Sequence, residues 1–434
     1  MVESKTRKRS WLRKAAANLA VALFGILMGL LVIELGLRLV LAAEPTALNA
    51  GSYNPWKMYV GWAPNPYQVR ISHGAHFPDV RIAYNSRGLR DVEHAVERPA
   101  GTFRILFLGD SFLEAAQVDL SQTFHRILEE RLNSAGLPMQ IECIAAGVSG
   151  WGTDQEVLYY ENEGYRYDAD LVVLMFTVND VTDNWIPMWE RSYNWNPRRV
   201  PPKPYFTLDQ GALVLNNFPY SNVVQPGGQG FAAAHNWLYV HLYTYRLLID
   251  LLQTHLPRLQ TALETRLGVP PAEQLAWTTE PGDSVAIALG LDSPQLYVYS
   301  RDYPDDEYRQ AWELTNRLVE RLQADVEANG ARLAVVSNTS AYATVPQDYA
   351  AMLASDPRTS GLAWDWNLPG ERMGAIAAGR GIPFFDLQPI FAARAPSAGP
   401  LHIPDDGHWT PEAHQLVADS LFEWLMESCL VPCR

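Results

Sequence analysis

Short apolar runs along the chain alternate with stretches in which apolar residues recur at helical spacing. Five of the runs have the length and composition of buried strands, and they lie at residues 104–108, 139–146, 171–176, 331–336 and 382–387. Helical periodicity begins after Ser121 and recurs near residues 155–160, 307–328, 371–378 and 411–426. Apolar strands that alternate with helices are typical of a parallel sheet covered on both faces. The pattern therefore predicts an α/β fold.

Two long segments depart from this alternation. Residues 44–100 are rich in Pro, Tyr, Asn and Gly and have little periodicity, so we expect an irregular lead-in packed on the main domain. An insertion at about residues 185–300 separates the third and fourth strands, with an apparent hairpin near 205–215 and a helical stretch around 238–256. Its tryptophans fit either stacking on sugar rings or ordinary packing, and packing is favoured because buried aromatic residues dominate cores. They are Trp185, Trp189, Trp195, Trp237 and Trp277.

Composition narrows the class of protein. The 434 residues include 34 Lys and Arg against 48 Asp and Glu, which gives a formal net charge of −14. Because the main body has no basic tract, it lacks the clustered cations that bind nucleic acid, and we expect no nucleic-acid partner. Three cysteines are too few for a disulfide-built scaffold or a Cys-rich zinc module. No His-Glu-x-x-His or similar ligand spacing is present, so we expect no metal and no cofactor.

Charge and hydropathy at the N-terminus indicate a membrane anchor. Residues 1–14 contain six Lys or Arg and one acid, and residues 15–33 are an uncharged, apolar run of 19 residues. About 20 such residues span a bilayer as a helix, and basic flanks stay in the cytoplasm. We expect a cytoplasmic tail over residues 1–14, a transmembrane helix over 15–43 and the rest of the chain outside, in the periplasm or extracellular space. A cleaved signal peptide is the alternative, disfavoured because its apolar region is usually shorter.

Polar motifs follow the predicted strands where each strand ends, and one more precedes the last helix. They are the Gly-Asp-Ser-Phe run at 109–112, the glycine-rich turn at 147–152, Asn179 with Asp180, and the Asp-Asp-Gly-His-Trp run at 405–409. Ligands of a parallel sheet bind outside the carboxyl ends of its strands. A serine, a base with an orienting carboxylate, and donors for an oxyanion are the parts that acyl-ester hydrolysis requires. The motifs therefore point to nucleophilic catalysis by serine.

In this order the motifs resemble the four sequence blocks of the SGNH (GDSL-like) hydrolase superfamily. The Asn85–Asp91 segment is similar to its membrane-anchored bacterial members. The resemblance covers about residues 101–184 and 331–427, with the insertion outside it. It implies a three-layer α/β/α fold with a five-stranded parallel sheet, in a hydrolase domain over residues 101–434.

The resemblance also implies a role for each motif. Ser111 matches the nucleophile, Gly150 and Asn179 match the residues that hold the oxyanion, and His408 matches the general base. Thr177 stands where the family usually has Gly in the third block, so the backbone there would be less free.

The acid that orients the base stays open between two neighbours. Asp405 fits the Asp-x-x-His spacing of the family, and Asp406 fits the Asp-x-His-Trp variant of many membrane-anchored relatives. Asp406 is favoured because Trp409 follows His408.

We expect from these motifs a membrane-anchored, exported serine ester hydrolase whose substrate is an acylated envelope or extracellular glycan. An O-acetyltransferase acting on a polysaccharide would use the same serine, because water and a sugar hydroxyl compete for one acyl-enzyme. A catalytically inactive glycan-binding protein is the third hypothesis. The sequence leaves the oligomeric state and the natural acyl group open.

Overall fold

The computed structural model describes residues 59–64, 66–192, 203–217, 291, 293–302, 306–397 and 399–432, with short pieces between 17 and 36 and at 244–245. The chain divides into two compact units. One comprises Met1–Leu48 with Val224–Pro271, and the other comprises Asn49–Val223 with Ala272–Arg434.

The larger unit is built on a parallel sheet of five strands. They are β3 (Thr102–Gly109), β4 (Gln140–Gly147), β5 (Leu171–Phe176), β8 (Arg332–Ser337) and β9 (Phe384–Asp386). Their order across the sheet is β4-β3-β5-β8-β9, and every neighbouring pair is parallel. The predicted α/β fold with five parallel strands is therefore confirmed. The central position of β3 and β5 brings the loops after these two strands together at one edge of the sheet.

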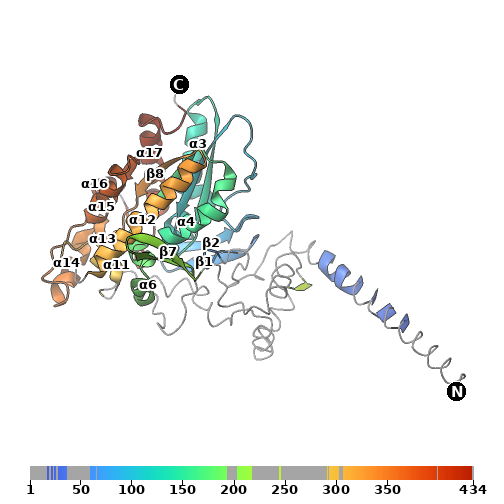
Figure 1. Cartoon of the computed structure of the whole chain (residues 1–434), viewed down its shortest axis with the longest axis horizontal. Coiled ribbons are helices and arrows are strands. Elements are labelled where there is room, and N and C mark those ends of the chain that lie inside the picture. The colour runs from blue at the N-terminus through green and yellow to red at the C-terminus, as the bar shows by residue number, and fades with distance from the viewer. Residues whose placement is uncertain are drawn as a thin grey trace, which may run out of the picture. The chain divides into compact units, whose positions relative to one another are not determined.

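Helices cover both faces of this sheet (Figure 1). Leu106 and Leu108 of β3 belong to one buried cluster, whereas Ile105 and Phe107 belong to another, because successive side chains of a strand point to opposite faces. The first face is covered by α4 (Thr153–Asn162), α12 (Glu307–Ala328) and α15 (Leu368–Ala378). The second is covered by α3 (Phe124–Ser134), α16 (Gln388–Arg394) and α17 (Pro411–Glu427). The architecture is three-layered, as the sequence resemblance implied.

Shorter elements connect these layers. They are α2 (Ser111–Glu114), α5 (Val178–Asn184), α6 (Ile186–Ser192), α11 (Pro294–Tyr297), α13 (Ala341–Thr344), α14 (Pro346–Ser355), and the 3-10 turns η2 (Leu120–Gln122) and η3 (Gly164–Tyr167).

Two antiparallel hairpins lie outside the main sheet. One joins β6 (Tyr205–Asp209) to β7 (Ala212–Asn216), as predicted for the insertion. The other joins β1 (Val69–Gly74) to β2 (Phe77–Ala83), so the expectation of an irregular lead-in over residues 44–100 was wrong for this part. Within β2 only Val80 and Ile82 are buried, and two apolar positions give too weak an alternation to be recognised in the sequence.

The smaller unit is described in short pieces. Residues 28–36 are helical, and the carboxylate of Glu34 accepts hydrogen bonds from the backbone N–H and the hydroxyl of Thr244, at 2.9 and 3.0 Å. Much of the predicted anchor over residues 15–43 lies outside the described residues, as does nearly all of the predicted helix around 238–256. No helix in the described part of the chain combines the length and the apolar character that a membrane crossing needs.

Candidate active site

Ser111 is the first residue of α2, directly after the carboxyl end of β3. The Asp110 carboxylate caps this helix by accepting a hydrogen bond from the N–H of Phe112, at 2.9 Å. The helix has a single turn and ends at Glu114, and the next residue, Ala115, has a φ of 54°, in the left-handed region. The sequence placed the next helix only after Ser121. The structure shows an additional helix before that one: α2 begins at Ser111 and ends before α3 starts at Phe124.

His408 lies against Ser111, although 297 positions separate the two residues in the chain. The Nε2 atom of His408 is 2.7 Å from the Oγ atom of Ser111, and its Nδ1 atom is 2.8 Å from an oxygen of Asp406. Asp406 also accepts a hydrogen bond from the backbone N–H of His408, at 3.1 Å. The three side chains therefore form a continuous carboxylate–imidazole–hydroxyl series.

Asp405 takes no part in this series. Its side chain is 91% exposed, and one of its oxygens lies 3.1 Å from His76 at the tip of the β1–β2 hairpin. Of the two acids that the sequence left open, it is Asp406 that contacts His408.

The loop that carries these residues turns tightly. Asp405 and Gly407 both have left-handed backbone angles, with φ of 60° and 83°, and Gly407 donates a backbone hydrogen bond to Ile403 at 2.9 Å. Trp409 is buried next to the loop, 5.2 Å from the ring of Phe112 and 6.0 Å from that of Phe124. The indole anchors the His408 loop in the core between α3 and α17.

Charge at the site makes the imidazole of His408 a stronger base. Burial acts to lower the pKa of His408, but the hydrogen bond and charge of Asp406, with the charges of Asp110 and Glu114, outweigh burial and raise that pKa above its ordinary value. Burial acts to raise the pKa of Asp406, but its hydrogen bond to His408 lowers it overall. Asp406 is therefore a stable anion that holds the imidazole in one orientation.

Gly150 lies in the turn after β4, next to the helix α2 that begins at Ser111. Its φ is 77°, which favours glycine, and the turn is closed by a hydrogen bond from the N–H of Trp151 to the carbonyl of Val148 at 3.1 Å. Among the described residues, neither the N–H of Gly150 nor that of Ser111 has a hydrogen-bond acceptor. Both amides can therefore donate to a ligand.

Asn179 is in the first turn of α5, after the carboxyl end of β5. Its side-chain amide donates one hydrogen bond to Asp183, at 3.1 Å. Thr177 stands where the sequence resemblance would place a Gly, and its φ of −115° makes its backbone extended, so no glycine is needed there. Its N–H donates to the side chain of Asp180 at 3.0 Å, which fixes the start of α5.

A cluster of buried carboxyl groups lies behind these loops. Its members are Asp110, Asp154, Glu156, Asp180 and Asp183, each with at most 1% of its surface exposed. Lys203, which is itself fully buried, pairs with Asp154 at 2.8 Å. Burial raises the pKa of each of these acids, that of Asp183 to about 7. Burial in this cluster therefore favours the protonated form of these acids more than an exposed site would.

Sequence reasoning missed residues that hold α2 and the neighbouring strand β4 in place. The fully buried Arg90 donates through its guanidinium to the carbonyl of Glu114, at 2.6 Å, and to those of Ala115 and Val118. Asp91 accepts a hydrogen bond from the N–H of Ala145 on β4, at 2.8 Å. Both residues lie in the Asn85–Asp91 segment. That segment contributed to the family resemblance, but it gave no structural role for Arg90 or Asp91.

Two further histidines of the C-terminal region are structural. His402 lies 3.2 Å from the carbonyl of Thr339, and burial lowers its pKa to about 4. His414 accepts a hydrogen bond from the N–H of Phe124 at 3.3 Å, and burial lowers its pKa to about 3. Within the part of the chain that is described, no three His, Cys, Asp or Glu side chains are arranged to hold a metal ion.

The tryptophans of the insertion that can be seen pack inside the protein. Trp189 is fully buried beside Trp62, with ring centres 6.4 Å apart. The half-buried Trp185 donates through its indole N–H to Glu307 at 3.1 Å. Trp195, Trp237 and Trp277 lie outside the described residues.

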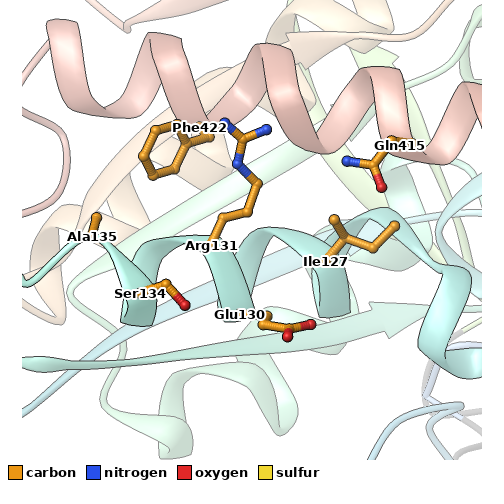
Figure 2. A pocket seen from close by; sticks show the side chains of 7 residues that line it. All are labelled: Ile127, Glu130, Arg131, Ser134, Ala135, Gln415 and Phe422. Carbon is orange, nitrogen blue, oxygen red and sulfur yellow. The ribbon is translucent and has the colours of Figure 1, made fainter.

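A hollow on the molecule lies apart from this site, between α3 and α17 (Figure 2). Arg131 of α3 points across it toward α17, where it pairs with Asp419 and lies over the ring of Phe422 at 4.5 Å. Neither Ser111 nor His408 lines it, so it is no part of the candidate site.

Comparisons with known proteins give distant structural neighbours only. No family model and no curated relative matches the chain. Matching solved structures include the acetyl xylan esterase AlAXEase, at 13% identity and a TM-score of 0.36, covering 75% of this chain and 100% of that one. They also include a catalytic mutant of an acetylxylan esterase from Geobacillus stearothermophilus, at 11% identity and a TM-score of 0.35, covering 74% and 93%. A lipase/acylhydrolase from Enterococcus faecalis matches at 11% identity and a TM-score of 0.34, covering 76% and 99%. At these TM-scores the neighbours support no conclusion about activity.

Proposed function

We propose that this chain is a serine ester hydrolase of the SGNH type. The observation that carries the proposal is the hydrogen-bonded series from Asp406 through His408 to Ser111, with distances of 2.8 and 2.7 Å. A hydroxyl is a weak nucleophile until a base takes its proton, and a carboxylate behind the base stabilises the imidazolium that forms.

In this mechanism the Oγ atom of Ser111 attacks the carbonyl carbon of the ester while its proton passes to Nε2 of His408. The tetrahedral intermediate collapses, the C–O bond to the alcohol breaks, and His408 returns the proton to the departing alkoxide. Water then attacks the acyl-Ser111 ester with His408 again acting as base, and the free acid and the serine hydroxyl are released.

The negative oxygen of the intermediate would be held by backbone amides and one side chain. Support comes from the N–H groups of Ser111 and Gly150, which have no acceptor among the described residues. Asn179 is the proposed third donor, through its side-chain amide, which donates to Asp183 at 3.1 Å. Loss of one such donor typically raises the barrier by about 2.7–4 kcal/mol.

Hydrolysis of a short-chain aryl ester by wild type and by Ser111→Ala tests the proposal. We expect the variant to lose at least about 10³-fold in kcat, because the substitution removes the hydroxyl that His408 contacts. Equal rates in the two proteins would remove the hydrolase proposal.

The proposed substrate is an acylated envelope or extracellular glycan, and the proposed location is the outer side of the cytoplasmic membrane. Both rest on the basic cluster over residues 1–14 and the apolar run after it. A reporter enzyme that works only in the cytoplasm can be fused after residue 434. Activity of this reporter would contradict the proposed topology.

Transfer of the acyl group to a sugar hydroxyl is the competing outcome of the same acyl-enzyme. Acetate release from an acetylated glycan, measured with and without an acceptor glycan, separates the two reactions. Release that does not depend on the acceptor supports hydrolysis.

A further inference from the structure

Glu114, the last residue of α2, joins the nucleophile helix to the turn that contains Gly150. Its side chain is buried, and one oxygen accepts hydrogen bonds from both the N–H and the hydroxyl of Ser149, the former at 2.7 Å. The other oxygen accepts from Arg70, at 2.9 Å, and from the hydroxyl of Tyr84. Four hydrogen bonds from three residues thus converge on a single carboxylate.

On the side of the turn, Ser149 is held from two directions. Glu114 fixes its N–H and its hydroxyl, and the indole N–H of Trp62 donates to its carbonyl at 2.9 Å. Ser149 is directly followed by Gly150, so the peptide plane between them, which carries the Gly150 N–H, has its orientation set by these contacts.

On the side of the helix, Glu114 is tied to Ser111 through one helical turn. The N–H of Glu114 donates to the carbonyl of Asp110 at 3.0 Å, and the N–H of Ala115 donates to that of Ser111 at 2.8 Å. A single turn has no stability of its own, so its geometry depends on such outside contacts. Arg90 provides one by binding the Glu114 carbonyl at 2.6 Å.

The Glu114 side chain is an anion. Burial acts to raise its pKa, but the charge of Arg70 and the hydrogen bonds from Ser149 and Tyr84 lower the pKa to about 2. Charge-assisted hydrogen bonds are shorter and stronger than neutral ones, which suits a contact that must fix two loops. Arg70 and Tyr84 belong to the β1–β2 hairpin region, so this hairpin takes part in the support.

We propose that Glu114 is a positioning residue that sets the Gly150 amide relative to Ser111, so that both backbone N–H groups point at the same oxyanion. The inference rests on the proposed function. It adds a residue that contacts neither the substrate nor the proton transferred between Ser111 and His408. Displacing one reacting group by about 1 Å can cost about 10²-fold in rate.

Kinetics of an aryl ester with the full-length protein test this role. We expect Glu114→Gln to lower kcat by about 10- to 100-fold while KM changes by less than about twofold, because the oxyanion exists only in the transition state and intermediate. Ser149 is exposed, and Ser149→Ala, which keeps the N–H but removes the hydroxyl, should cause a smaller loss. The double variant should be no slower than Glu114→Gln alone, because both changes break the same contact.

Glu142→Gln is the matched control. Glu142 pairs with the buried Arg104 at 2.7 Å near the start of β4, at the opposite end of the strand from Ser149, so its removal should leave kcat unchanged. Two results would overturn the inference provided that Ser111→Ala is inactive. One is a wild-type kcat in a folded Glu114→Gln protein, and the other is a double variant in which the two losses in kcat add. If Glu114→Gln does not fold, wild-type kcat in Ser149→Ala overturns it. An active Ser111→Ala would instead remove the proposed function.

Discussion

Asp405 and Asp406 are adjacent in the chain, yet they contact different histidines. Asp406 lies 2.8 Å from His408, and Asp405 lies 3.1 Å from His76. The difference comes from the left-handed backbone at Asp405 and Gly407, which turns the two side chains to different sides. Sequence spacing alone allowed either acid, because it does not contain the φ angle of one loop residue.

Replacing each acid by its amide separates their roles. We expect Asp406→Asn to lower kcat by about 10⁴-fold, because the amide does not stabilise an imidazolium, and Asp405→Asn to stay near wild type. Since Asp406 raises the pKa of His408, the acid limb of kcat/KM should lie above pH 6.5 in the wild type and move to lower pH in Asp406→Asn. Equal losses in the two variants would contradict the assignment.

At the scale of elements, the length of the apolar pattern decided what the sequence could predict. The strands β3, β4 and β5 and the helix α12 are long and strongly patterned, and all were expected near their observed ends. The helix α2 was missed because it has four residues, and contacts distant in sequence hold it, from Arg90 above all. Local propensity carries no information about such tertiary contacts.

The helix that follows His408 has a start that the sequence did predict. Thr410 accepts a hydrogen bond from the N–H of Ala413 at 3.3 Å, and Pro411 occupies the first helical position of α17.

We expect Thr410→Ala to lower the free energy of unfolding by about 1 kcal/mol, because one backbone donor of the helix loses its acceptor. Thr410→Ser keeps the hydroxyl and should retain most of this stability. Urea denaturation of the three proteins measures the difference. A Ser variant as unstable as the Ala variant would mean that the methyl group, rather than the cap, matters.

For the molecule as a whole, the buried acids make stability depend on pH. Both carboxylate oxygens of Glu156 lack a hydrogen-bond partner among the described residues, and burial, with the charges of Asp110 and Asp154, raises its pKa well above the ordinary value. The folded state then keeps a proton that the unfolded state has released. Stability is therefore fully present below about pH 4 and is lost as the pH rises through the folded pKa.

We expect Glu156→Gln to flatten this dependence. Each carboxyl that retains a proton on folding contributes a slope of about 1.4 kcal/mol per pH unit, and the amide removes one such group. Urea unfolding between pH 5 and 9 should show the variant losing less stability than the wild type toward alkaline pH. Glu130→Gln on the exposed face of α3 is the control and should follow the wild type. Parallel curves for Glu156→Gln and the wild type would contradict the expectation.

The separation of Ser111 and His408 by 297 positions also has a consequence for synthesis. A ribosome produces the serine long before the imidazole, and the two side chains can meet only once the segment around His408 has packed against the sheet. A polypeptide that stops before His408 thus lacks the imidazole that contacts Ser111. Under the proposed function, activity would therefore appear only after translation has passed His408 and the segment that carries it has folded.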